Sequence, residues 1–314
     1  MMVEKLRFPI VKRFKLFALI ALLFMITGVV SLVLLPFGVN LFVMDVDFAG
    51  GTTMHFAMHQ EMDSAAQQEV QQLIESETDV TVSSLQRTGD GTEIILKTVD
   101  ISTQERQEII DLLKDQYGIA DADVLQVDNV SSSVGREMQR TAFTAAILAA
   151  VLMMVYVAIR FEFTSGLAAL TCLAHDLLVM LSFYVIFRIP LNMNFIAAIL
   201  TILGYSINAS IIVFDRVREN RRLTPREPFE ETVERSIWQT VARNVNTTLT
   251  TVIMVGMIFL LGVSSLRNFT LPLLVGMIAG AYSSIFLSGP LWAFYRKKFR
   301  KRGYRGTAAQ QKRA

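Results

Sequence analysis

The sequence predicts a polytopic α-helical membrane protein with six transmembrane helices and one extracytoplasmic α+β domain, of the ferredoxin-like βαββαβ type, between helices 1 and 2. Two observations carry this prediction. Hydrophobic residues make up 52% of the 314 residues and charged residues only 18%, whereas about a quarter of the residues in a soluble domain are charged. The apolar residues are also gathered into long runs, which are interrupted by one acidic segment, 37–140.

Six segments reach the length that the hydrocarbon core of a bilayer demands, which is about 20 predominantly apolar residues. Five of them contain no Asp, Glu, Lys or Arg, and the third contains Asp176 alone. The first segment is longer than the apolar region of a signal peptide and lacks a small-residue cleavage site, so we expect a retained helix. The predicted spans are residues 16–36, 141–159, 163–187, 189–214, 244–266 and 268–295.

Basic residues are distributed asymmetrically about these spans. Five lie in the N-terminal segment 1–15, seven arginines lie within 215–243, and nine basic residues lie in the tail 296–314. With six spans these segments share one side, and the short loops opposite hold only Arg188 and Arg267. Because Lys and Arg are enriched in cytoplasmic loops, we expect both termini to be cytoplasmic. The basic tail is expected to contact membrane lipids rather than nucleic acid.

The acidic segment 37–140 shows the periodicities of one small folded domain. Alternating apolar residues over 52–58 predict a strand, and capping-box patterns over 64–67 and 102–105 each precede a helical apolar stripe. The sequence TGDG at 88–91 lies between two strand-like stretches and predicts a hairpin. With a closing strand, the order is βαββαβ, the ferredoxin-like arrangement. Nothing in it suggests catalysis, so we expect a domain that contacts another protein.

Asp176 is the only acid well inside a predicted span, and His175 precedes it. A charged side chain in hydrocarbon is costly, so such residues usually face the interior of a helix bundle and serve transport. We therefore interpret His175 and Asp176 as a candidate proton station. The alternative is a structural hydrogen bond that fixes helix packing.

The fourth and fifth spans carry further polar residues. Tyr205, Asn208 and Asp215 recur at helical spacing, so they project to one side of the fourth span. Arg243 and Thr247, four residues apart, lie on one side of the helix at the start of the fifth span. We expect both sides to line a hydrated polar seam inside the bundle, whereas simple helix–helix contact is the alternative for each residue taken singly.

The segment 215–243 between these spans predicts a separate amphipathic helix on the cytoplasmic side. Its charges are nearly balanced, and apolar residues recur every four positions from Phe229 to Val241. Such a helix would lie on the membrane surface or against the bundle.

The sequence carries neither a P-loop nor a metal-ligand cluster of recognised spacing. We therefore expect no catalytic residue, no metal and no cofactor. Any energy for transport has to come from an ion gradient or from a partner protein.

Several motifs taken together resemble the SecF family, the membrane subunits of the bacterial Sec protein translocase, which are related to the RND superfamily. VDFAGGT follows the first span and VGREMQRTA leads into the second. VAIRFEF, LAHD, GYSIN and VFDRVREN then follow in the family's order. The resemblance covers nearly the whole chain, and the matching positions of its first motif are Asp47, Phe48, Gly50 and Gly51.

This resemblance implies a protein transport component and not an enzyme. SecF pairs with SecD in a twelve-helix bundle, which associates with the SecY/SecE/SecG channel and with YidC-type insertases. The complex uses the proton motive force to assist the translocation of unfolded preprotein across the cytoplasmic (inner) membrane. The resemblance therefore implies a multi-pass protein of that membrane.

The chain departs from the family pattern at one position. Many members have an acid directly after the asparagine of the span-four motif, where this chain has Ala209 after Asn208. Since alanine cannot carry a proton, coupling would have to use Asp176, a residue of SecD or a chain of water. Arg243 matches a basic family position that is also linked to coupling.

Two rival functions are compatible with six spans and one outer domain. The first is a half-transporter of the RND type that exports lipid or small molecules, although such pumps usually have twelve spans and larger outer domains. The second is a membrane sensor or scaffold, although the tail contains no signalling module.

Overall fold

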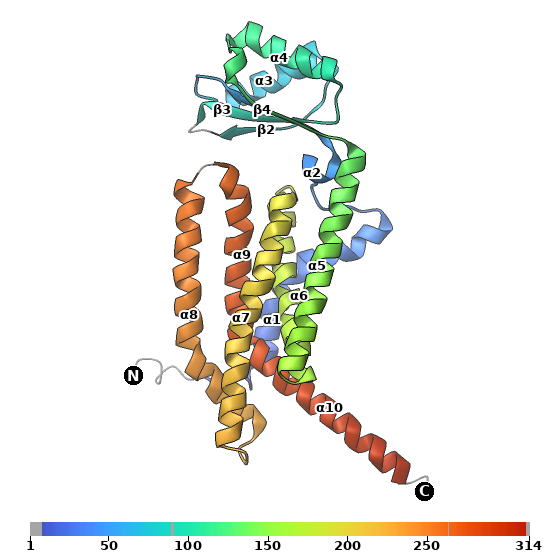
Figure 1. Cartoon of the computed structure of the whole chain (residues 1–314), viewed down its shortest axis with the longest axis vertical. Coiled ribbons are helices and arrows are strands. Elements are labelled where there is room, and N and C mark those ends of the chain that lie inside the picture. Colours follow the sequence, from blue (N-terminus) through green and yellow to red (C-terminus); the bar gives the residue numbers. More distant parts are fainter. Residues whose placement is uncertain (1–7, 89–90, 263, 312–314) are drawn as a thin grey trace.

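The computed structural model describes residues 8–88, 91–262 and 264–311. The chain forms two parts along one long axis, a bundle of long helices and a small sheet domain at one end of it (Figure 1). Each part has its own cluster of buried hydrophobic residues.

Six helices within the described ranges are long and apolar enough to cross a membrane, as the sequence predicts. They are α1 (Phe14–Leu34), α5 (Ser132–Arg160), α6 (Phe163–Ile186), α7 (Met193–Leu223), α8 (Phe229–Leu261) and α9 (Ser264–Phe286).

The prediction of a separate amphipathic helix over 215–243 is wrong. These residues are divided between α7 and α8, which continue beyond the apolar segments and are joined by a turn over 224–228. The periodic apolar residues are real, and Val233 and Ile237 are buried in the core of the bundle. The same stripe is equally compatible with an extension of a spanning helix. No Pro or Gly lies within residues 229–255, so the sequence contains no helix break at the predicted boundary between residues 243 and 244.

The predicted sixth span, 268–295, also ends too late. The chain turns at Leu287, and α10 (Ser288–Gln311) then leaves the bundle obliquely (Figure 1). Pro290 lies in the first turn of α10, where the lack of a backbone N–H is tolerated, so the sequence Gly289-Pro290 suits a new helix start.

The sheet domain follows α1 in the chain. Its strands are antiparallel throughout and lie in the order β2-β3-β1-β4. The elements are β1 (Gly51–Ala57), α3 (Ser64–Glu77), β2 (Val82–Thr88), β3 (Glu93–Thr98), α4 (Thr103–Tyr117) and β4 (Val124–Val130), with the short helices η2 (Leu35–Phe37), α2 (Val46–Ala49) and η4 (Asp121–Asp123) in the connections.

The helices α3 and α4 cover the face of the sheet that points away from the bundle (Figure 1). Met54 and Phe56 of β1 are fully buried in the core of this domain, whereas the alternate residue His55 is only half-buried. This is the alternation expected of a strand that is covered on one face.

The capping pattern predicted at the start of α4 forms, and the one at α3 is displaced by one residue. Ser102 and Glu105 form a reciprocal capping box, in which the backbone N–H of Ser102 donates to the carboxylate and holds the pKa of Glu105 below its ordinary value. At α3 the N-cap is Asp63, whose carboxylate accepts a hydrogen bond from the backbone N–H of Ala66. The predicted cap, Ser64, is instead the first residue of that helix.

Candidate functional site

The carboxylate of Asp176 is fully buried inside the bundle, where α6, α7 and α9 come together. Oδ1 of Asp176 lies 2.9 Å from Nδ1 of His175. Oδ2 accepts hydrogen bonds from two hydroxyl groups, those of Ser206 on α7 and Ser283 on α9, the latter at 3.0 Å. A single carboxylate therefore connects three helices through side chains that are themselves buried.

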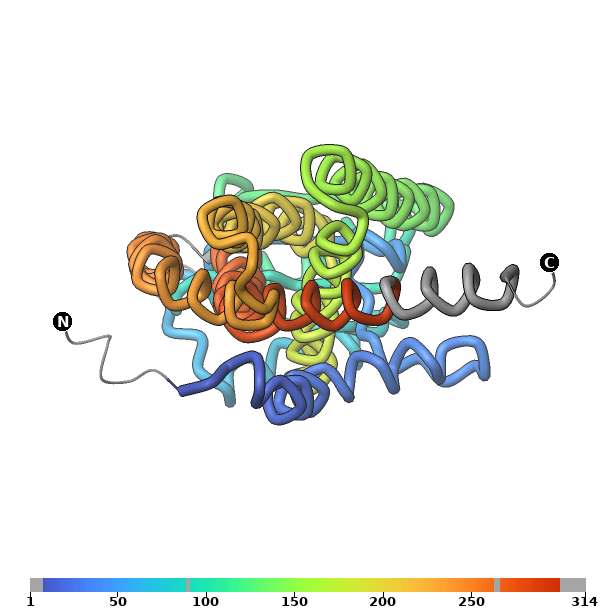
Figure 2. The backbone as a smooth tube through the Cα atoms, turned by 90° about the horizontal axis from the view of Figure 1, so that it is seen from below, coloured from blue at the N-terminus to red at the C-terminus, as the bar shows by residue number. Residues whose placement is uncertain are grey.

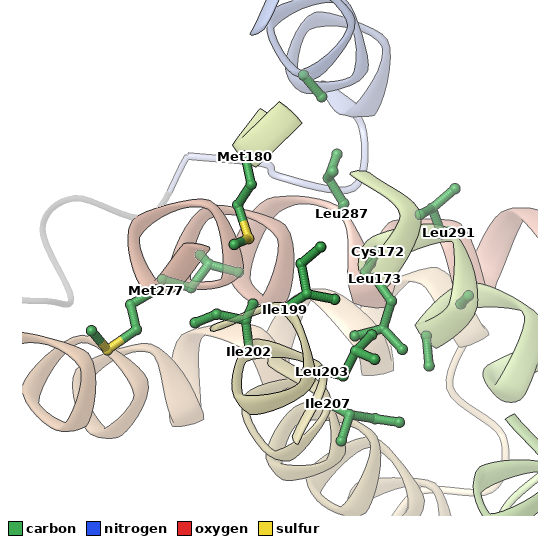
Figure 3. Packing of buried hydrophobic residues seen from close by; sticks show 14 of the residues in the cluster. Cys172, Leu173, Met180, Ile199, Ile202, Leu203, Ile207, Met277, Leu287 and Leu291 are labelled. Carbon is green, nitrogen blue, oxygen red and sulfur yellow. The ribbon is translucent and has the colours of Figure 1, made fainter. Parts of the chain in front are cut away.

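Two glycines allow α9 to approach its neighbours at this level. A Cβ atom at Gly280 would lie 3.2 Å from Cβ of Ser206, and one at Gly276 would lie 2.6 Å from Cγ1 of Ile202. Close approach through small residues is a common way to pack helices in a membrane. The apolar side chains around this contact, including Met180, Ile202 and Met277, are shown in Figure 3. The carboxylate thus has hydroxyl partners within apolar surroundings.

His175 extends this contact toward α1. Its ring is buried and lies stacked against Tyr282, with the ring centroids 5.9 Å apart and an interplanar angle of 28°. The Tyr282 hydroxyl donates a hydrogen bond of 2.8 Å to the carbonyl of Phe17 in α1. The predicted pair of His175 and Asp176 is therefore in contact, and through Tyr282 it is connected to a fourth helix, α1.

The polar side of α7 does not face the interior of this chain. Asn208 and Asp215 are exposed and Tyr205 is half-buried, whereas Ser206 and Ser210 occupy the buried side. Within this chain, the prediction of an interior polar seam at Tyr205, Asn208 and Asp215 is therefore wrong. Helical periodicity identifies residues that share a side, but it does not say which neighbour that side meets.

Helix α8 also carries exposed polar residues beside α7, at the point where its apolar part begins. Arg243 and Thr247 are exposed, and between them Asn244 is buried and donates a 3.3 Å hydrogen bond to the carbonyl of Ala209. This bond places the two polar stretches at the same level. Together they form an open polar surface on the outside of the six-helix bundle.

Ala209 lies among polar atoms that have no partner within the described part of the chain. The buried atoms Tyr205 Oη, Ser210 Oγ and Asn244 Oδ1 make no hydrogen bond there. Tyr205 and Ser210 lie within one helical turn of Ala209, and Asn244 is bonded to its carbonyl. Since buried polar groups are normally hydrogen-bonded, these three atoms make the surroundings of Ala209 unusual within the described part of the chain.

A second polar cluster attaches the sheet domain to the bundle. Asp45 forms an ion pair with Lys97 at the end of β3, with Nζ 2.7 and 2.8 Å from its two oxygens, and both side chains are mostly buried. Asn192, the N-cap of α7, also donates to Asp45 at 3.4 Å. The backbone adds two hydrogen bonds between the residues before α2 and Leu191.

The family motif residues lie at this attachment. Asp47 accepts a 2.9 Å hydrogen bond from the backbone N–H of Met193, the first residue of α7, where the helix dipole favours a negative charge. Phe48 is buried within the core of the bundle. We call the segment 45–51 the docking loop, because it joins the ends of α7, β3 and α5.

The glycines of the docking loop have backbone conformations that other residues rarely adopt. Gly50 has φ +82° and Gly51 has φ +148°. A Cβ atom at Gly50 would lie 2.6 Å from Cα of Ser132, the first residue of α5. A Cβ atom at Gly135, one turn into α5, would lie 2.8 Å from the carbonyl oxygen of Phe48. The motif therefore requires glycine because the backbones approach too closely for any side chain.

Sequence reasoning missed three of the contacts that define these two clusters. Ser206 and Ser283 appear in polar stretches of the sequence, but only the packing of α7 and α9 identifies them as partners of Asp176. The third missed contact is the ion pair of Lys97 with Asp45. Its position in an apolar strand indicates that Lys97 has a partner, because an unpaired lysine there would be costly to bury.

Comparison with known proteins adds three findings. The family described as "Protein export membrane protein SecD/SecF, C-terminal" matches residues 109–298. The Protein translocase subunit SecF of Alicyclobacillus acidocaldarius is 33% identical over 316 residues, which cover 97% of this chain and 98% of that protein. The Protein translocase subunit SecDF of Bacillus subtilis is 34% identical over 264 residues, which cover 83% of this chain and 35% of that protein.

A solved structure is also similar over nearly the whole chain. It is the crystal structure of SecDF, a translocon-associated membrane protein from Thermus thermophilus, with a TM-score of 0.80 and 31% sequence identity. The match covers 93% of this chain and 39% of the crystallised chain, so this chain corresponds to one part of a longer protein there.

The docking loop generates a prediction with a matched control. Gly50 and Gly38 both have φ +82°, but Gly38 has ψ 3°, in the left-handed helical region, whereas Gly50 has ψ 156°. Nothing lies within 4 Å of a Cβ atom at Gly38. We expect Gly38→Ala to cost roughly 1–2 kcal/mol of stability from backbone strain alone. Gly50→Ala should cost about 3 kcal/mol or more, because its backbone conformation is nearly confined to glycine and its Cβ atom would also clash with α5.

Thermal unfolding of the full-length protein in detergent, with protease digestion to follow the attachment of the sheet domain, measures both effects. Equal destabilisation by the two substitutions would show that the approach to Ser132 does not constrain the docking loop.

Proposed function

The chain belongs to the SecD/SecF family of protein-export membrane proteins, and on this premise we propose that it assists preprotein translocation with SecD by using the proton motive force. The chain is a SecF-like translocase subunit, a transport component rather than an enzyme. The observation that carries the mechanism is the buried carboxylate of Asp176, which is held by hydroxyls from two further helices.

Asp176 is the group that we propose to exchange protons in this chain. A carboxylate is the simplest carrier, and Ala209 removes the carboxylate that the family often has in span four. Protonation of Oδ2 would turn an acceptor of two hydrogen bonds into a donor, so at least one of Ser206 and Ser283 would have to change its partner. Such a change would alter the contact between α7 and α9.

The docking loop supplies a physical route from this contact to the sheet domain. Ser206 and Met193 lie on the same helix, separated by about 20 Å at 1.5 Å per residue. The backbone N–H of Met193 is bonded to Asp47 and its neighbour Asn192 to Asp45. A shift or rotation of α7 would therefore reach the docking loop directly, and through Lys97 it would reach β3.

SecD is the partner that we propose for the open polar surface on α7 and α8. Exposed Asn208, Asp215, Arg243 and Thr247 are costly to leave against lipid, and a second six-helix bundle would cover them. Half-buried Tyr205, whose hydroxyl has no partner within the described part of the chain, would lie at the edge of that interface. In this arrangement the polar seam expected from the sequence exists, but it lies between two subunits.

The distribution of basic residues supports a location and an orientation in the membrane. We propose a multi-pass protein of the cytoplasmic membrane with both termini in the cytoplasm. Apart from Arg188 and Arg267, the described basic residues of the short connections lie at the end of the bundle away from the sheet. The sheet domain would then be extracytoplasmic. Its element order and its strand order support a ferredoxin-like assignment.

We further propose that the SecY/SecE/SecG channel, a YidC-type insertase and the emerging unfolded preprotein are partners of the assembled complex. The sheet domain is the part of this chain that would meet the preprotein. Its own hydrophobic core supports a role as a folded module that moves as one body.

Purification from native membranes tests the assignment of the partner. Tagged protein should bring down a SecD-like subunit and channel subunits. Substitution of Asn208 and Thr247 by bulky leucine residues should reduce recovery of the SecD-like subunit at least severalfold, because both lie on the proposed interface. Leucine substitutions at exposed Gln107 and Glu108 of α4 provide the control. Absence of any SecD-like partner with the unsubstituted protein would refute the translocase assignment.

The role of Asp176 generates a second prediction. Asp176→Asn retains the shape and a hydrogen-bond acceptor but cannot exchange a proton, so it should abolish the gradient-dependent part of preprotein translocation into membrane vesicles. Assembly with the partner should be unchanged. Asp111→Asn makes the same chemical change on the exposed surface of α4 and should have no effect. Unimpaired gradient-dependent translocation in the Asp176 variant would leave Asp176 a packing residue.

A further inference from the structure

A basic pocket opens at the end of the bundle away from the sheet. It has a volume of about 310 Å³ and lies where the α5–α6 turn, the end of α7 and the starts of α8 and α10 meet. Its floor is apolar and aromatic, formed by Val217, Phe229 and Trp292. Four arginines line it, namely Arg218, Arg221, Arg222 and Arg296.

The positive charge of this pocket is poorly compensated. Glu162 is the one acid among its described lining residues, and its carboxylate is 3.7 Å from Arg296. Arg218 and Arg221 donate to backbone carbonyl oxygens, which carry no net charge. The described part of the chain provides no hydrogen bond or ion pair for Arg222. Four guanidinium groups around an apolar floor are suited to a phosphate, which Arg binds with two parallel hydrogen bonds.

The position of the pocket identifies the kind of phosphate. The pocket lies beside the turn between two membrane-crossing helices, and the residues that flank this turn are strongly exposed and apolar: Ile159 is 81% and Phe163 is 62% exposed. Phe163 also meets the exposed ring of Phe299 on α10, edge to face at 6.0 Å. A ligand here would have a phosphate in the pocket and apolar chains against α5 and α6.

We propose that this pocket binds the headgroup phosphate of an anionic phospholipid, with the acyl chains along the exposed apolar residues at the α5–α6 turn. Basic pockets between transmembrane helices at the cytoplasmic side are established features of lipid recognition. A free phosphate would use the arginines but not the apolar surface beside them.

The neighbouring cavity does not compete for this assignment. It has a volume of about 590 Å³ and shares Arg218 and Arg222 with the pocket, but Asp215 and Glu219 also line it. With Arg160 it has three arginines against two acids, so its charge is more fully compensated than that of the pocket. The phosphate therefore belongs on the side where Arg296 and Arg221 lie.

A bound lipid would also fix the direction of α10. Arg296 lies over the ring of Phe229 at 4.2 Å, so α10 is already held against the start of α8 at the pocket. Figure 2, which looks at this end of the molecule, shows α10 leaving the bundle sideways from there. A phosphate bridging Arg296 with Arg222 would connect α10 to the end of α7 as well.

Native mass spectrometry of the full-length protein in detergent, titrated with phosphatidylglycerol or with phosphatidylcholine, tests the proposal. Retention of phosphatidylglycerol should exceed that of phosphatidylcholine. Arg222→Gln and Arg296→Gln should each weaken retention of phosphatidylglycerol about fivefold, the effect expected of one basic residue near an anionic headgroup. Arg226→Gln, in the exposed turn at the same end of the bundle but outside the pocket lining, is the matched control and should have little effect.

Substitution of Glu162, the acid in the pocket, should change lipid retention in the opposite direction. Glu162→Gln should strengthen retention of phosphatidylglycerol, because it removes the competing carboxylate beside Arg296. A loss that is equal in the Arg222 and Arg226 variants would indicate diffuse surface charge and would overturn the proposal. Competition by inorganic phosphate at the affinity of the lipid would also overturn it, since the site would then bind the free anion. These readouts are independent of translocation and of SecD.

Discussion

The contact that the rest of the bundle depends on is the buried carboxylate of Asp176 between the hydroxyls of Ser206 and Ser283. A carboxylate in hydrocarbon is tolerated only with hydrogen-bond partners, so α7 and α9 have to bring small hydroxyl residues to α6 at one level. That requirement accounts for glycine at 276 and 280, because a larger side chain would separate α9 from Met180, Ile202 and Ser206. The same contact gives a protonation event a structural consequence, since the hydroxyls bind the two forms of the carboxyl group differently.

The docking loop makes the same helix, α7, responsible for the position of the sheet domain. Asp45 and Asp47 bind the two residues at its start, and Ser206 binds Asp176 farther along it. A displacement of α7 at Ser206 would therefore also move the residues that hold the docking loop. The glycines of the motif, which the family resemblance singles out by sequence, are explained by the approach of Gly50 to Ser132 and of Gly135 to Phe48.

The sequence predicted those features that depend on local patterns. The six spans follow from length and composition, the order of helices and strands in the sheet domain follows from periodicity, and Asp176 is conspicuous because it is alone in an apolar segment. The failures concern relations between elements. The stripe from Phe229 to Ile237 is the same whether its helix is separate or continuous with α8, and the polar side of α7 is the same whether it meets this chain or another. Lys97 gave no local sign that Asp45 would be its partner.

We propose above all that Asp176 exchanges a proton in the working complex. Isotope-edited infrared difference spectroscopy of the complex in membranes, recorded as a function of pH, observes this group directly. We expect a carboxylic acid carbonyl band that changes with pH in the unsubstituted protein and is missing from Asp176→Asn. A spectrum with no pH-dependent band attributable to Asp176 would contradict proton exchange at this residue, even if the substitution slowed translocation.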